Sequence, residues 1–158
     1  MERKPFILSI VMGLLAVIIS AAILVIITYK TGRIFGIITF LSGVVCGGAT
    51  GWGYKIGKGK IVSKNDAQFF LTLCTIFGAV GVIAAYLGPY LILFSKFLSL
   101  NSYLNLLKFG ILDILFIVLG AFGGRWAGKK VALSILINQA YEQQEKKYLK
   151  KKTKTYNK

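Results

Sequence analysis

Four long runs of apolar residues, separated by short polar stretches, make up most of the chain. They cover residues 6–28, 34–54, 67–94 and 109–127. A bilayer core about 30 Å thick is crossed by about 20 apolar residues in an α-helix, and backbone groups in lipid must be hydrogen-bonded within the same segment. The pattern therefore predicts an all-α fold, an integral membrane four-helix bundle, in residues 1–130.

The third run has distinctive ends. Ser63 and Asp66 precede it, and such side chains cap the free N–H groups of a helix N-terminus. Gly88 and Pro89 interrupt its second half, where a proline bends or ends a helix because it lacks an N–H group. Residues 90–107 are predicted either to continue the helix with a bend or to form a loop at the membrane surface.

The C-terminal stretch, residues 131–158, is more polar. Five of its apolar residues fit one helical face: Leu133, Ile137, Ala140, Tyr141 and Tyr148. Seven lysines then occupy the thirteen residues 146–158, and dense like charge is typical of disordered segments. We expect a cytoplasmic amphipathic helix that leads into a disordered basic tail.

The lysines and arginines between the runs set the expected orientation. Sixteen of the twenty lie at the N-terminus, in the stretch 55–64 or after residue 124, and four lie in the other two connections. Basic residues beside membrane spans concentrate on the cytoplasmic side. We therefore expect a multi-pass protein with cytoplasmic N- and C-termini. The first run is too long for the apolar part of a signal peptide, so we expect it to be retained.

Composition agrees with a membrane protein and removes several kinds of chemistry. The 158 residues are 56% hydrophobic and 16% charged, whereas soluble domains have about 25% charged residues. The chain has no histidine, which removes the commonest metal ligand and general base. Cys46 and Cys74 lie within apolar runs and lack zinc-binding spacing. We expect no metal, no cofactor and no catalytic site, and therefore not an enzyme.

Glycines recur at every fourth residue in the second run and across the end of the fourth. Residues four apart share one face of a helix, and glycine there allows another backbone to approach closely. We interpret both rows as helix-packing surfaces, formed by Gly43, Gly47, Gly51, Gly120, Gly124 and Gly128. The sequence leaves open whether these surfaces meet within one chain or between two.

The stretch GWGYKIGKGK, residues 51–60, joins a glycine-rich helix to a basic loop. It lacks the G-x-x-x-x-G-K-[ST] spacing of a phosphate-binding loop, so nucleotide binding is not expected. Lysines beside an anionic membrane contribute about 1 kcal/mol each to binding. We predict that these lysines contact lipid head groups: Lys55, Lys58, Lys60, Lys146, Lys147, Lys150, Lys151 and Lys152.

The region around this stretch, residues 34–90, resembles small multi-pass bacterial membrane proteins without an assigned activity. They too have a glycine-rich helix that ends in a Gly-Tyr, glycine and lysine loop before another span. Here these features are Gly53, Tyr54, Gly57 and the lysines of residues 55–60. The resemblance implies a bacterial plasma membrane location, and it implies no activity and no site.

Asp113 is the one acidic residue inside an apolar run. An ionisable group within a membrane is costly, which makes Asp113 a candidate for carrying a proton or binding a cation. The structural alternative is a position near interfacial water, where Asp113 pairs with Lys96 or Lys108.

These observations favour a non-enzymatic scaffold or accessory subunit that packs through its glycine faces. Its expected partners are anionic lipids and either a second copy of the chain or another membrane protein. The alternative is a small transporter or channel subunit that uses Asp113 for proton or cation coupling. Nucleic acid is not an expected partner, because the lysines attract phosphate but no folded module for reading bases accompanies them.

Overall fold

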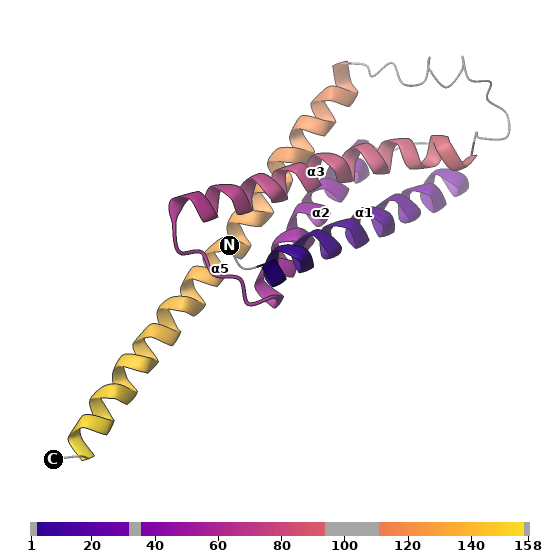
Figure 1. Cartoon of the computed structure of the whole chain (residues 1–158). Helices are drawn as coiled ribbons and strands as arrows, with labels where there is room; N and C mark the ends of the chain where they lie inside the picture. Colours follow the sequence, from indigo (N-terminus) through magenta and orange to yellow (C-terminus); the bar gives the residue numbers. More distant parts are fainter. Residues whose placement is uncertain (1–2, 32–35, 94–110, 157–158) are drawn as a thin grey trace.

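Four α-helices form the part of the chain that the computed structural model describes, residues 3–31, 36–93 and 111–156, with side chains described over 3–30, 37–89 and 114–149. The helices are α1 (Arg3–Thr31), α2 (Gly36–Ile56), α3 (Lys64–Leu93) and α5 (Ile111–Tyr156), and these residues contain no strand (Figure 1). The all-α prediction is confirmed for this part of the chain.

Three of the helices are long and apolar enough to cross a membrane. These segments are Arg3–Lys30 in α1, Ile37–Ile56 in α2 and Lys64–Pro89 in α3. They correspond to the first three predicted spans, each within a few residues of its predicted ends. The fourth predicted span, 109–127, begins in residues outside the described part of the chain and stays a prediction.

Local hydrogen bonds explain where α3 begins. The backbone N–H of Asp66 donates to Ser63 Oγ over 3.1 Å, and the backbone N–H of Ser63 donates to Asp66 Oδ2 over 3.0 Å. This reciprocal pair is a capping box, which satisfies two N–H groups that a helix start leaves free. The predicted cap at the start of the third run is therefore present.

The end of α2 is closed by a different motif. The N–H of Gly59 donates to the carbonyl of Tyr54, and the N–H of Lys58 donates to the carbonyl of Lys55, both over 3.0 Å. This is the Schellman pattern, which places the residue after the helix cap in the left-handed region. Lys58 occupies that position with φ of 59°, although glycine is the usual residue there.

The helices are arranged around α2 and α3. α2 contacts each of the other three helices, whereas α1 and α5 do not contact each other in the described part of the chain. α1 and α5 therefore lie on different sides of the α2–α3 pair, and α5 runs far beyond the rest of the bundle towards the C-terminus (Figure 1).

Two helices continue past the points where the sequence indicated a change. α3 includes Pro89 and ends at Leu93, so the proline does not end the helix. Neighbouring helices make such a proline tolerable in a membrane, and α1 lies beside it, since a Cβ atom at Gly88 would be 3.5 Å from the Cβ of Ala21.

α5 is one helix from Ile111 to Tyr156. The prediction of a disordered tail from Lys146 is therefore wrong over residues 146–156. Lysine, glutamine, glutamate and leucine are good helix formers, and Glu142 lies four residues before Lys146, a spacing at which opposite charges support a helix.

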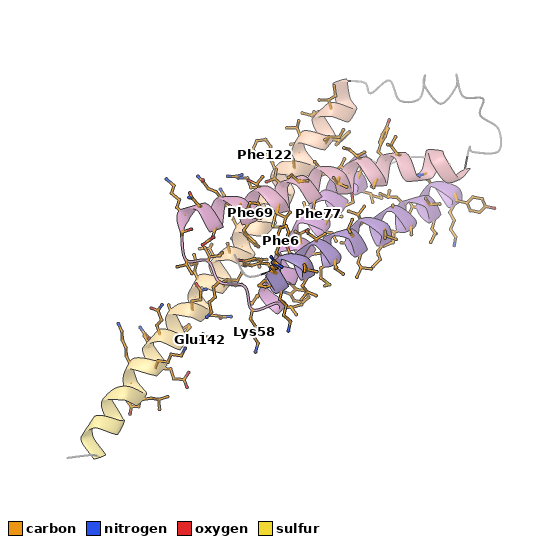
Figure 2. The ribbon with its side chains drawn as sticks, in the orientation of Figure 1. Phe6, Lys58, Phe69, Phe77, Phe122 and Glu142 are labelled. Carbon is orange, nitrogen blue, oxygen red and sulfur yellow. The ribbon has the colours of Figure 1, made fainter. Side chains whose placement is uncertain are left out.

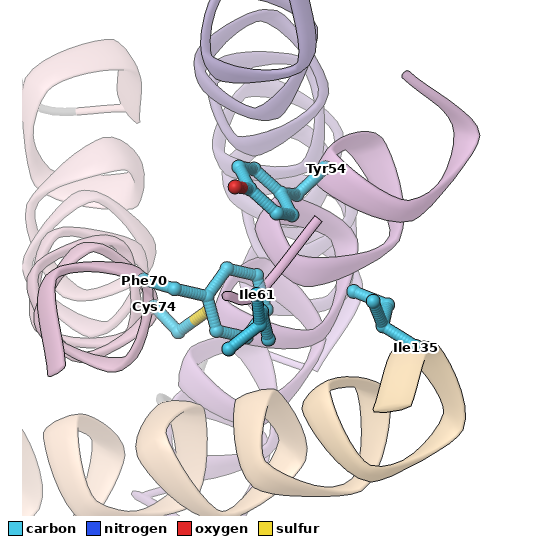
Figure 3. Packing of buried hydrophobic residues seen from close by; sticks show 5 residues of the cluster. All are labelled: Tyr54, Ile61, Phe70, Cys74 and Ile135. Atoms are coloured by element: carbon cyan, nitrogen blue, oxygen red, sulfur yellow. The ribbon is translucent and has the colours of Figure 1, made fainter. Parts of the chain in front are cut away.

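One buried cluster packs the loop between α2 and α3 against three helices. It contains Tyr54 of α2, Ile61 of the loop, Phe70 and Cys74 of α3, and Ile135 of α5 (Figure 3). The rings of Tyr54 and Phe70 are 5.1 Å apart between centroids. The core therefore extends to the end of the bundle where the loop and α5 meet.

The outer surface of the bundle is apolar. Large aliphatic side chains of α1 point away from the other helices, and Ile18, for example, is 63% exposed (Figure 2). Between α1 and α2 this surface is hollowed by an apolar cavity of about 430 Å³. A soluble monomer seldom exposes so large a continuous apolar surface, and a surface of this size marks contact with a membrane or a protein.

Candidate functional site

Five glycines from three helices meet at a close contact between backbones. We call this set, Gly43 and Gly47 of α2, Gly78 of α3, and Gly120 and Gly124 of α5, the glycine junction. All five are buried. The sequence left open whether the two glycine rows meet within one chain, and here α2 and α5 of the same chain bring them together.

No side chain fits at the glycine junction. A Cβ atom at Gly43 would lie 2.8 Å from the Cα of Gly120 and 2.9 Å from the carbonyl oxygen of Gly78. A Cβ atom at Gly124 would lie 2.6 Å from the carbonyl oxygen of Cys74, and one at Gly47 would overlap the Cα of Gly124. At these three positions backbone atoms are among the obstacles, so a larger residue must separate the helices, whereas at Gly120 the nearest obstacle would be Cγ2 of Val82.

The remaining members of the two rows contact side chains. A Cβ atom at Gly51 would lie 3.3 Å from both Phe70 and Val131, and one at Gly128 would lie 2.8 Å from the Cβ of Cys74. These two positions extend the contact towards the buried cluster of Tyr54 and Ile61.

Sequence reasoning missed Gly78. Its signal was present, because Cys74 and Gly78 are four residues apart and place two small side chains on one face of α3. A row of two small residues is common in membrane helices, whereas the contact of Gly78 with both other helices follows only from the three-dimensional arrangement.

Hydroxyl groups add a few hydrogen bonds between the helices. Ser9 Oγ of α1 donates to the carbonyl of Thr50 in α2 over 2.7 Å. Ser42 Oγ donates to the carbonyl of Thr39 in its own helix over 2.6 Å and also lies within hydrogen-bond distance, 3.1 Å, of the carbonyl of Gly81 in α3. Thr50 Oγ1 donates within its own helix, to the carbonyl of Cys46. These three buried hydroxyls therefore donate to backbone carbonyls.

Acidic and metal-binding groups do not gather anywhere in the described part of the chain, which contains no cluster of three or more histidine, cysteine, aspartate or glutamate residues. Cys46 and Cys74 are buried and free. Asp113 lies in the first turn of α5, but its side chain is outside the described residues, as are Lys96 and Lys108.

The predicted lipid-contacting lysines fall into two groups at one end of the bundle. Lys55 lies in the last turn of α2, and Lys58 and Lys60 lie in the loop that follows. Lys146 and Lys147 lie on α5 and are exposed. The side chains of Lys150, Lys151 and Lys152 lie outside the described residues.

The C-terminal part of α5 extends beyond the bundle (Figure 1). We call residues 140–156 the α5 arm, and every described side chain in it, from Ala140 to Leu149, is exposed. Tyr141 and Tyr148 are each 68% exposed. The α5 arm therefore offers both aromatic and cationic side chains to other molecules.

A hollow lies between the two groups of lysines and is lined by one lysine from each group. It has a volume of about 420 Å³ and lies between loop residues 60–62 and α5 residues 136–146, with Lys60 and Lys146 both on its lining. Glu142 of α5 also lines it, and Figure 2 places Glu142 at the same end of the bundle as Lys58.

Known proteins provide no further guide to this arrangement. No protein-family model, no curated protein and no solved structure matches the chain. Its functional interpretation therefore depends on the glycine junction, the two groups of lysines and the α5 arm.

Proposed function

We propose that this chain is a non-enzymatic multi-pass membrane protein that acts as a scaffold or accessory subunit and holds the α5 arm at the cytoplasmic face of a bacterial plasma membrane. In this proposal the apolar runs form four spans and both termini are cytoplasmic. The lysine and arginine distribution supports the orientation, because sixteen of the twenty fall on one side.

The continuity of α5 is the observation that carries the proposal. The helix passes through the glycine junction, where Gly120 and Gly124 lie against the backbones of α2 and α3. It then runs without a break into the α5 arm. Because the backbone of α5 is packed closely at the glycine junction, the α5 arm has a defined direction. A defined direction suits a segment that presents side chains to a partner.

The position of the glycines changes where a partner is expected to bind. The glycine rows are buried inside the chain, so they are not a free surface for a second protein. Tyr141 and Tyr148 are exposed large side chains on the arm, and tyrosine is enriched at protein interfaces. We therefore assign partner binding to the α5 arm.

The loop lysines have a separate role in this proposal. Lys55, Lys58 and Lys60 follow directly on the apolar part of α2, which places them at the lipid head groups if α2 crosses the membrane. Contacts of this kind contribute about 1 kcal/mol for each lysine. They would fix the depth of the bundle and its orientation.

The test is purification of the tagged full chain in nanodiscs, with its mass measured by light scattering and co-purifying proteins identified. We expect a stoichiometric partner that is lost from the double variant Tyr141→Ser and Tyr148→Ser. The matched control is Tyr29→Ser, which removes another exposed tyrosine, at the C-terminal end of α1. A particle without a partner contradicts the proposal and favours the transporter alternative, for which Asp113→Asn should abolish flux.

A further inference from the structure

The hollow between the loop and α5 has fixed walls. Ile61 is only 7% exposed and belongs to the buried cluster with Tyr54 and Ile135. In the amide orientation that satisfies both of its groups, Gln139 accepts from Ile61 N over 3.2 Å and donates to Ile61 O over 3.3 Å. The backbone of the loop at Ile61 is therefore held against α5 by the side chain of Gln139.

Lys60 is positioned by the same contacts. Tyr54 OH donates to the carbonyl oxygen of Lys60 over 3.0 Å. The Lys60 backbone is thus fixed while its side chain is exposed on the lining of the hollow. Lys146 lines the same hollow from α5, so two lysines from separate elements border one space of about 420 Å³.

The remaining lining has a definite chemistry. Val62, Leu136 and Ala140 supply apolar surface, and Glu142 supplies one carboxylate. The charged groups on the lining are Lys60, Lys146 and Glu142, with a net charge of +1. A ligand with one negative charge, hydroxyl groups and an apolar portion matches this lining.

We propose that the hollow binds a phosphodiester that carries hydroxyl groups, the chemistry of the glycerol head group of an anionic phospholipid. The phosphate lies between Lys60 and Lys146, and a hydroxyl group donates to the Glu142 carboxylate. The apolar side chains beside them face the glycerol backbone. Val62 is 84% exposed and Leu136 is 43% exposed. This inference rests on the proposed function for the position of the loop at the cytoplasmic leaflet.

The full chain in detergent micelles is titrated with phosphatidylglycerol and with phosphatidylcholine of the same acyl chains, and lipid-bound species are counted by native mass spectrometry. Phosphatidylglycerol should bind more tightly. The double variant Lys60→Gln and Lys146→Gln should weaken its binding about 30-fold, the product of two lysine contacts of ordinary strength.

The matched control is the double variant Lys64→Gln and Lys129→Gln. It removes the same charge from exposed lysines on α3 and α5 outside the hollow, and it should change the affinity less than about threefold, as surface charges beyond contact are screened. An equal loss in both double variants would overturn the proposal in favour of diffuse attraction to the basic surface.

A second variant tests the space rather than the charge. Ala140→Trp fills the hollow from an exposed position and leaves both lysines in place, so it should abolish the selectivity for phosphatidylglycerol. Unchanged selectivity would overturn the site. Competition by soluble glycerol phosphate at millimolar concentration would identify a free phosphate ester as the ligand, whereas its failure to compete supports the membrane lipid.

A separate measurement distinguishes an error in the proposed lipid site from an error in the proposed function. Cysteine replaces Lys58, which is exposed in the loop, and its side of the membrane is read by an impermeant thiol reagent in intact cells. Labelling from outside contradicts the proposed orientation without affecting the micelle titration. Labelling only after lysis, together with loss of lipid selectivity, overturns the site alone.

Discussion

The two halves of α5 are helical for different reasons. The first half contains Gly120, Gly124 and Gly128, and each glycine disfavours a helix by about 1 kcal/mol relative to alanine. The α5 arm contains no glycine and is rich in lysine, glutamine and glutamate. These residue types favour a helix even where no other helix packs against it. The comparison teaches that packing determines the first half of this helix and local preference the second.

The largest expected loss of stability comes from adding a side chain at the glycine junction in the first half of α5. Gly124→Leu places a side chain against the carbonyl of Cys74 and the backbone of Gly78, so we expect a loss of about 4 kcal/mol or more in the free energy of unfolding. Unfolding in SDS titrations, followed by circular dichroism, measures it. Gly48→Ala is the control, since its nearest neighbour would be Ala127 at an ordinary 3.5 Å. A stable Gly124→Leu protein would refute the role of the glycine junction.

A proline in the second half should act only locally. Gln144→Pro removes a helical hydrogen bond in the α5 arm and costs about 3 kcal/mol there. We expect a smaller far-ultraviolet helical signal and an unchanged melting temperature of the bundle, with Gln144→Ala as the control. A fall in that melting temperature would mean that the arm supports the bundle and that the two halves are not independent.

The boundary between the halves is set by Gln139. Gln139→Ala leaves the N–H and carbonyl of Ile61 without their side-chain partner, at a cost of about 1–2 kcal/mol. Hydrogen exchange should become faster over residues 57–63, while exchange at the glycine junction stays slow. Gln143→Ala on the next turn is the control. Unchanged exchange in the loop would show that Ile61 alone holds it to α5.

The smallest expected loss of stability tests whether hydrogen bonds or close backbone contacts hold the bundle together. Ser42→Ala removes the hydroxyl that donates to the carbonyl of Thr39 within α2 and to that of Gly81 in α3, and a hydrogen bond between membrane helices contributes about 0.6 kcal/mol. Ser134→Ala, which removes a bond within α5 only, is the control. The same SDS titration measures both. A loss for Ser42→Ala as large as that for Gly124→Leu would mean that hydrogen bonds, rather than close backbone contact, hold the helices.

The sequence predicted the parts of this fold that depend on residues near each other in the chain. The apolar runs gave the first three helices to within a few residues, and the cap at Ser63 and Asp66 was readable from residue type alone. The four-residue spacing also identified Gly43 and Gly120 as contact positions, because periodicity fixes which side chains share a face.

The sequence could not predict which surfaces meet. The contact of Gly78 with two other helices and the pairing of Gln139 with Ile61 join residues that lie far apart in the chain. No local pattern encodes such pairs. The unbroken course of α5 was also missed, because the composition changes from apolar to basic while the helix continues on the local preference of its lysine, glutamine and glutamate residues.

The unbroken course of α5 makes the helix a lever whose fulcrum is the glycine junction. From Gly124 to Tyr156 the helix is about 48 Å long. Tilting it by about 10°, a change within the range that membrane helices adopt as bilayer thickness varies, would displace its far end by about 8 Å. In the proposed orientation, the reach of the α5 arm into the cytoplasm would then depend on the thickness of the bilayer around the first half of α5.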